Sequence, residues 1–239
     1  MSAVPRALTH VLTADPVVAL TFDDGPDPIY TPRLLDVLAR YRARATFFMI
    51  GARAQCQPDL VARVASEGHV IGNHSWDHPS FPLISRDEKR QPVLACAQAV
   101  SPPGAKLFRP PYGDLDFDSW LEINKMGYEV VAWRVDPHDW DDSPAPRIAQ
   151  TVLRRLHPGA IVLLHDGLFD ARESRFFPRG ATISAVEILL NRLTGIVRFI
   201  TIPDLLACGT PCYRPRAQVR LKGELNRLMR QDGPARCYL

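Results

Sequence analysis

Two adjacent carboxylates, Asp23 and Asp24, end an apolar run of the sequence. The run, residues 17–22, has the β-branched and apolar composition of a buried strand, and Gly25 with Pro26 turns the chain directly after it. Neighbouring carboxylates repel each other, so a buried pair needs a metal ion on one member and a cation on the other. The sequence therefore predicts either a catalytic pair at a strand end or a solvated Asp-Gly turn.

Four more polar clusters follow apolar stretches of the chain. They are His74-Ser75-Trp76-Asp77-His78, Arg109-Pro110-Pro111-Tyr112-Gly113, Asp136-Pro137-His138-Asp139-Trp140 and His165-Asp166. In a parallel α/β barrel the carboxyl ends of the strands share one face, so all of these clusters would lie at one mouth. Their convergence is a stronger indication of an active site than any single cluster.

The histidines of the second cluster have the spacing of metal ligands. His74 and His78 are four residues apart, which places both imidazoles on one side of a helical turn or a tight loop. With Asp24 they form a His-His-carboxylate set with open positions, which suits catalytic zinc or non-haem iron. Asp23 is then free to act as a general base, and Arg109 could hold it ionised. Surface histidines and a solvated arginine are the alternative.

The last cluster could supply a general acid. His165 follows the apolar run 160–164, where a neutral histidine bonded to the backbone is the common arrangement. Asp139 could instead raise the pKa of His165, and a protonated imidazole is what a leaving amine or alkoxide needs. Trp140 and Leu163 could line a small apolar acyl site, although such residues belong more often to the core.

The elements that must position these residues alternate between strand and helix. Strands are predicted over residues 17–22, 45–50, 69–72, 106–109, 128–133, 160–164 and 199–202. Helices are predicted between them, over residues 31–41, 58–67, 85–100, 118–126, 143–157 and 182–193. This alternation predicts parallel βαβ units, one strand short of an eight-stranded barrel.

Composition and charge exclude several classes of protein. The chain has 239 residues, of which 46% are hydrophobic, and a net charge of +3, which argues against nucleic-acid or membrane binding over the whole surface. Five scattered cysteines predict neither a zinc knuckle nor a disulfide framework. No stretch is long and apolar enough for a signal peptide or a membrane span. The sequence predicts a cytoplasmic chain, or a secreted one if a leader has been removed.

The basic surplus is concentrated at the C-terminus. Residues 211–239 hold seven Lys or Arg against two acids. A stripe of apolar residues at helical spacing accompanies them, made of Leu221, Leu225, Leu228 and Met229. We expect a helix docked on the domain, with its charges in water, because so small a stripe gains most by covering exposed core.

In kind, order and spacing, the five clusters resemble the motifs of the polysaccharide deacetylases, the NodB-homology or carbohydrate esterase family four domain. The matching motifs are Thr-Phe-Asp-Asp-Gly-Pro, His-Ser-x-x-His, Arg-x-Pro-Tyr-Gly, Asp-x-x-Asp-Trp and Leu-x-His-Asp. The resemblance implies an α/β fold, a distorted seven-stranded (β/α) barrel similar to a TIM barrel. The implied catalytic domain covers residues 15–210, between an N-terminal extension of residues 1–14 and the basic tail of residues 211–239.

The resemblance also implies a role for each site residue. The base would be Asp23, the general acid His165, and the metal ligands Asp24, His74 and His78. The groups that support them would be Arg109 beside Asp23, Asp139 beside His165, and the backbone N–H of Tyr112 at the developing oxyanion. The implied substrate-binding residues are Trp140, Leu163, Pro110 and Pro111. The implied cofactor is one divalent ion, zinc first, with cobalt, nickel or manganese as alternatives.

The resemblance implies removal of N-acetyl groups from N-acetylglucosamine-containing oligosaccharide or polysaccharide. Because no export signal is seen, a smaller substrate such as a chitin oligosaccharide is expected first. An O-acetyl esterase acting on xylan and a deformylase acting on a lipid-linked amino sugar would keep the same site. A non-catalytic sugar-binding module is a further alternative, against which intact Asp23 and His165 argue. No nucleic-acid partner is expected, and the oligomeric state is left open.

Overall fold

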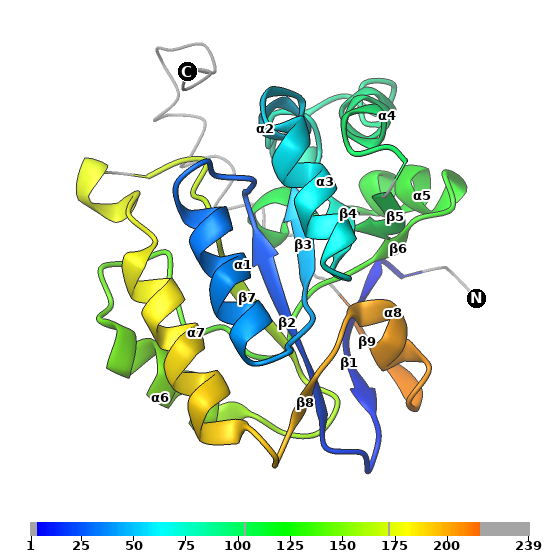
Figure 1. Cartoon of the computed structure of the whole chain (residues 1–239). Helices are drawn as coiled ribbons and strands as arrows, with labels where there is room; N and C mark the ends of the chain where they lie inside the picture. The colour runs from blue at the N-terminus through cyan, green and yellow to red at the C-terminus, as the bar shows by residue number, and fades with distance from the viewer. Residues whose placement is uncertain (1–3, 103, 172, 216–239) are drawn as a thin grey trace.

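The core of the molecule is a curled parallel sheet of seven strands. The computed structural model describes residues 4–215 except 103 and 172 (Figure 1). The strand order is β6-β5-β4-β3-β2-β7, and β8 pairs with β2 beside that path. The strands are β2 (Val17–Asp23), β3 (Thr46–Met49), β4 (Val70–Asn73), β5 (Gly104–Phe108), β6 (Glu129–Val130), β7 (Ile161–His165) and β8 (Arg198–Phe199). The predicted α/β class and the distorted seven-stranded barrel are confirmed.

Helices cover the outside of this sheet (Figure 1). They are α1 (Tyr30–Arg40), α2 (Gly51–Cys56), α3 (Pro58–Ser66), α4 (Arg90–Ala99), α5 (Phe117–Lys125), α6 (Ala145–Arg155) and α7 (Gly180–Leu193). The short helix α8 (Ile202–Leu206) instead packs against the inner face of the sheet, in one cluster with Val17, Ala19 and Phe48. Each longer helix buries one apolar face, as Leu34, Leu35 and Leu38 do on α1. The central strands β2, β3 and β7, covered on both faces, are buried at every residue and mostly apolar.

Two strands outside the predicted set help to close the barrel between β6 and β7. β1 (Arg6–Leu12) pairs antiparallel with β9 (Thr210–Pro215). The carbonyl of Leu8 accepts a 2.7 Å hydrogen bond from the N–H of Ala132, and the N–H of Val11 donates to the Gly159 carbonyl at 2.9 Å. β1 thus contacts residues next to β6 and β7, the strands at the two ends of the sheet order. It lies within the predicted N-terminal extension, and β9 begins at the predicted boundary of the basic tail.

The helix starts predicted at Ser85 and Asp118 are wrong. The capping pair does form, since the Glu88 carboxylate accepts hydrogen bonds from the N–H and hydroxyl of Ser85, but it closes a turn before α4, which begins at Arg90. Pro92 therefore falls in the first turn of α4, where an N–H has no partner to lose. On α5 the cap is Asp116, whose side chain accepts from the Ser119 N–H at 2.7 Å. Asp118 lies in the first turn instead.

The strand predicted over residues 199–202 stops at Phe199, because Thr201 caps α8. The helix predicted in the tail lies outside the described residues.

In the part of the chain that the structure describes, no helix combines the length and apolar character needed to cross a bilayer. Cys96, Cys208 and Cys212, which lie in that part, are free thiols.

Candidate active site

The strand ends bring the predicted site residues together. Asp23 ends β2 and lies opposite His165, which ends the neighbouring strand β7. His74 directly follows β4, and Arg109 directly follows β5. The clusters therefore share the carboxyl-terminal face of the sheet, as the parallel arrangement requires.

Asp24, His74 and His78 form a buried cluster at this face. One ligand-type atom from each residue lies within 4.8 Å of the others. Asp24 Oδ1 is 3.3 Å from Nε2 of His74 and 3.3 Å from Nε2 of His78. It accepts no hydrogen bond of good geometry from the described residues. A buried carboxylate oxygen that faces two imidazole nitrogens is a donor set for a divalent metal, so these residues fit the ion that was predicted.

The surroundings orient each of these ligands. His74 Nδ1 lies 2.7 Å from the Arg109 carbonyl, which can only accept, so Nδ1 carries the proton and Nε2 faces the cluster. The N–H of Phe169 donates to Asp24 Oδ2 at 2.9 Å, which leaves Oδ1 for the ion. Burial alone would raise the pKa of Asp24, but the close contacts with His78 and His74 hold that pKa well below its usual range.

Left-handed backbone conformations concentrate in the loops of this face. Of the described residues, six that are not glycine have positive φ, and five of them lie here: Asp24, Ser75, His78, Tyr112 and His138. The values include 71° at Asp24 and 59° at His78. Such a conformation costs on the order of 1–3 kcal/mol and persists only where the surroundings impose it. The strain is therefore placed at two of the metal ligands and at the residue predicted to bind an oxyanion.

Arg109 is fully buried and holds Asp23. Its Nη1 donates to Asp23 Oδ1 and to Thr21 Oγ1, both at 2.7 Å, and Nη2 donates to the Ala132 carbonyl at 3.0 Å. The guanidinium also lies 4.1 Å from the centre of the Phe48 ring. The alternative of a solvated surface cation is therefore wrong. With Oδ1 held in this way, Asp23 Oδ2 lies on the side of the metal cluster, 3.9 Å from His74 Nε2.

His165 is held by Asp139. Nδ1 of His165 lies 2.8 Å from Asp139 Oδ1, while Asp139 Oδ2 accepts from the His165 N–H at 2.9 Å and from Thr182 Oγ1 at 3.0 Å. Burial alone would lower the pKa of His165, but the charge and hydrogen bond of Asp139, with smaller contributions from Asp24 and Asp23, raise it to about 9. His165 is therefore protonated at neutral pH, and its Nε2–H remains available to a substrate.

We expect Asp139→Asn to move the basic limb of the pH profile. If His165 must be protonated, the rate of the parent falls as pH rises through about 9, the raised pKa of His165. Removing the charge of Asp139 lowers that pKa, so the rate of the variant should fall at lower pH. The measurement is kcat against pH across the neutral and alkaline range. Asp142→Asn, which changes an exposed carboxylate nearby, is the control, and a basic limb that did not move would contradict the role of Asp139.

The remaining predicted residues lie in or beside these loops. Tyr112 has φ of 58°, and its ring meets that of His78 edge-on at 4.4 Å between centroids. Pro110, Pro111 and Leu163 are buried. Trp140 is 39% exposed and contacts the His138 ring at 5.2 Å. The substrate-binding roles of Trp140, Leu163, Pro110 and Pro111 stay predictions.

Sequence reasoning missed several residues that support the site. They are Thr31, Arg53, Phe169, Arg179 and Thr182, together with a role for Asp166. Asp166 is buried, accepts a hydrogen bond from Thr31 Oγ1, and lies so close to Gly25 that a Cβ there would be 2.3 Å from its carboxylate. Burial is the main cause that raises the pKa of Asp166 to about 7. Position 25 in the first motif must therefore be glycine, because the carboxylate of Asp166 in the last motif leaves no room for a Cβ.

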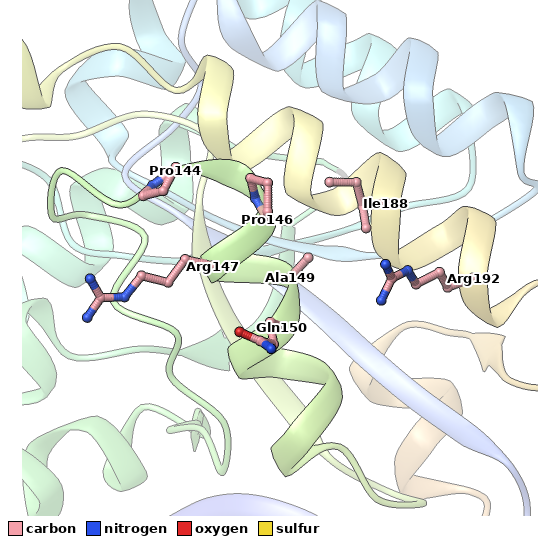
Figure 2. A pocket seen from close by; sticks show the side chains of 7 residues that line it. All are labelled: Pro144, Pro146, Arg147, Ala149, Gln150, Ile188 and Arg192. Carbon is pink, nitrogen blue, oxygen red and sulfur yellow. The ribbon is translucent and has the colours of Figure 1, made fainter.

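A groove of about 670 Å³ between α6 and α7 is a separate feature (Figure 2). It is lined by Pro144, Pro146, Arg147, Ala149, Gln150, Ile188 and Arg192. None of these is a carboxylate, imidazole or thiol, so the groove has no metal-ligating side chain. The chemistry is therefore at the strand ends and not in this groove.

The fold and the strand-end cluster define a class, the metal-dependent hydrolases built on an α/β barrel. The family described as Polysaccharide deacetylase matches residues 10–131. A chitooligosaccharide deacetylase of Bradyrhizobium sp. is 44% identical over 183 residues, which are 74% of this chain and 84% of that protein. A peptidoglycan-N-acetylglucosamine deacetylase of Bacillus cereus is 40% identical over 196 residues, 80% of this chain and 88% of that protein.

A solved structure supports the same conclusion. The crystal structure of the Bc1960 peptidoglycan N-acetylglucosamine deacetylase superposes with a TM-score of 0.74 and 32% identity, covering 82% of this chain and 91% of that one. The chain belongs to the polysaccharide deacetylase family, carbohydrate esterase family four, and is a carbohydrate deacetylase. The family resemblance predicted from the five motifs is confirmed.

Proposed function

We propose that this protein removes N-acetyl groups from N-acetylglucosamine-containing oligosaccharides, with chitin oligosaccharides as the preferred substrate. The catalytic part of the proposal rests on one observation. A buried metal-ligand cluster is flanked by a carboxylate held by Arg109 on one side and by a protonated His165 on the other. The substrate part is supported by relatives named chitooligosaccharide deacetylases, at 44% and 42% identity.

We expect zinc as the bound ion, held by Asp24, His74 and His78. Two imidazoles and one carboxylate are a common donor set of catalytic zinc, and cobalt, nickel or manganese can use the same donors. When bound, such an ion supplies Lewis-acid polarisation of a carbonyl and lowers the pKa of water. The other steps fall to the side chains around it.

Asp23 acts as the general base in this proposal. Its Oδ2 is on the side of the metal cluster and takes the proton of the attacking water, while Oδ1 stays bonded to Arg109. The buried guanidinium keeps the carboxylate from rotating away, so the proton-accepting oxygen is fixed before the substrate binds.

His165 acts as the general acid. Its Nδ1–H is bonded to Asp139, so the proton on Nε2 is the one given to the nitrogen that leaves as the amine. The backbone N–H of Tyr112, held at φ of 58°, donates to the carbonyl oxygen as negative charge develops there. Base and acid thus stand at the ends of neighbouring strands, β2 and β7, on the two sides of the reacting carbon.

A panel of acylated substrates tests the proposal. Acetate release from chitin oligosaccharides, peptidoglycan and acetylated xylan, and formate release from an N-formylated amino sugar, are compared on one zinc-loaded preparation. We expect the highest kcat/KM on chitin oligosaccharides. A higher value on peptidoglycan would overturn the substrate assignment, and a higher value on xylan or on the formyl compound would overturn the reaction. No release from any substrate would favour a binding module.

A further inference from the structure

We propose that Arg53, on α2, is a positioning residue that makes Asp24 a one-oxygen metal ligand. It does so by clamping the backbone of Asp24 to the segment that follows β7. The inference rests on the proposed metal-binding role of Asp24. Arg53 belongs to none of the five motifs.

The clamp is one guanidinium on two carbonyls. Arg53 Nη1 donates to the carbonyl of Asp24 at 2.9 Å, and Nη2 donates to the carbonyl of Leu168 at 2.9 Å. These carbonyls belong to the loops after β2 and β7, which are adjacent strands. The planar fork of arginine suits this task, because both nitrogens donate in fixed directions from a single side chain.

The peptide group held by Arg53 is the one that bonds Asp24. The Leu168 carbonyl and the Phe169 N–H belong to the same planar peptide unit. When Nη2 holds that carbonyl, the N–H on the opposite side of the unit is directed at Asp24 Oδ2, to which it donates at 2.9 Å. The Phe169 ring also lies against the His78 ring, at 5.0 Å between centroids. One cation thus fixes the surroundings of two ligands.

The consequence is that the two oxygens of Asp24 become different. Oδ2 is bonded to a backbone N–H, whereas Oδ1 faces Nε2 of both histidines at 3.3 Å. Without the clamp the 167–169 segment could turn its N–H away, and Oδ2 would be free to compete for the ion. The clamp therefore fixes both the position of Asp24 and the number of oxygens it offers.

The space between Gly167, Arg53 and the backbone of Asp24 is too small for a side chain at position 167. A Cβ at Gly167 would lie 2.6 Å from Arg53 Nη1 and 3.0 Å from the Asp24 carbonyl oxygen. Gly167 has no positive φ, so alanine there would be opposed only by crowding. Gly167→Ala therefore disturbs the clamp from the opposite side, without removing any hydrogen-bonding group.

The test is zinc affinity, measured by competition with a chromophoric chelator on metal-free protein. Arg53→Met, which keeps the length but loses both donors, and Gly167→Ala should each weaken zinc binding by about 10- to 100-fold, the usual effect of losing an outer partner of a ligand. In the cobalt-loaded variants, a second Asp24 oxygen on the ion should raise the coordination number and weaken the visible absorption. Arg53→Lys, with one nitrogen for two carbonyls, should restore the affinity only in part.

Matched controls come from the same region of the chain. Arg175→Met removes an exposed arginine paired with Glu173, and Gly180→Ala adds a methyl group where no atom lies within 4 Å. Both should bind zinc as the parent does.

Parental zinc affinity and cobalt absorption in Arg53→Met and Gly167→Ala would overturn the proposal, even if their melting temperatures fell. If Arg53→Met did not fold, parental affinity in Arg53→Lys would overturn it equally. A parent that bound no zinc would instead refute the proposed function.

Discussion

Asp23→Asn is expected to lower turnover by about 10²-fold or more while zinc still binds with one ion per chain. An amide oxygen can still accept the hydrogen bond that Arg109 Nη1 donates to Oδ1 at 2.7 Å. An amide cannot take a proton from water, so the base is removed while its place in the structure is kept. The measurements are kcat on a chitin oligosaccharide and the zinc content of the purified variant.

The control for this variant is Asp59→Asn, which changes an exposed carboxylate on α3. Its turnover should equal that of the parent. If Asp23→Asn kept full zinc and stayed within a few-fold of the parent, Asp23 would have no part in proton transfer.

Arg109→Met should cause the largest loss of stability among single substitutions at the site. Arg109 is 0% exposed and Asp23 is 3% exposed, so removing the cation leaves a buried carboxylate without its partner. Breaking a buried pair in this way costs about 3–5 kcal/mol. The free energy of unfolding from denaturant titration of the metal-free protein measures the effect.

Arg40→Met provides the comparison. Arg40 pairs with Glu187 at 3.0 Å, but the two side chains are 59% and 43% exposed, so the loss should stay within about 1 kcal/mol. The double variant Arg109→Met with Asp23→Asn should recover part of the lost stability, because the unpaired charge is then gone as well. A single Arg109→Met variant as stable as Arg40→Met would contradict the account of this pair.

The central barrel strands β2, β3 and β7 were predictable because all of their residues are buried. In a strand such as β2, all seven residues are buried, so most of them are apolar or β-branched. This composition can be recognised in the sequence without tertiary information. β9 gives no such signal, since it contains two prolines and sits at the edge of a two-stranded sheet. The helices α2 and α8 have six and five residues, too few for a helical period to show.

The ligands were predictable from residue type, but their partners were not. Asp24, His74 and His78 carry side chains that bind metals, whereas the groups that orient them include the carbonyl of Arg109 and the N–H of Phe169. Every residue has such backbone groups, so the sequence cannot show which of them are used. The burial of Arg109 likewise depends on tertiary packing, since its guanidinium lies against the Phe48 ring.

Titration of the metal-free protein with zinc, while acetate release from a chitin oligosaccharide is followed, tests the central claim most directly. The cluster of Asp24, His74 and His78 predicts a rate that rises linearly with added zinc and stops rising at one ion per chain. In Asp24→Ala the same titration should give no rise at that ratio. A full rate before any zinc is added, or an unchanged titration in Asp24→Ala, would contradict the account.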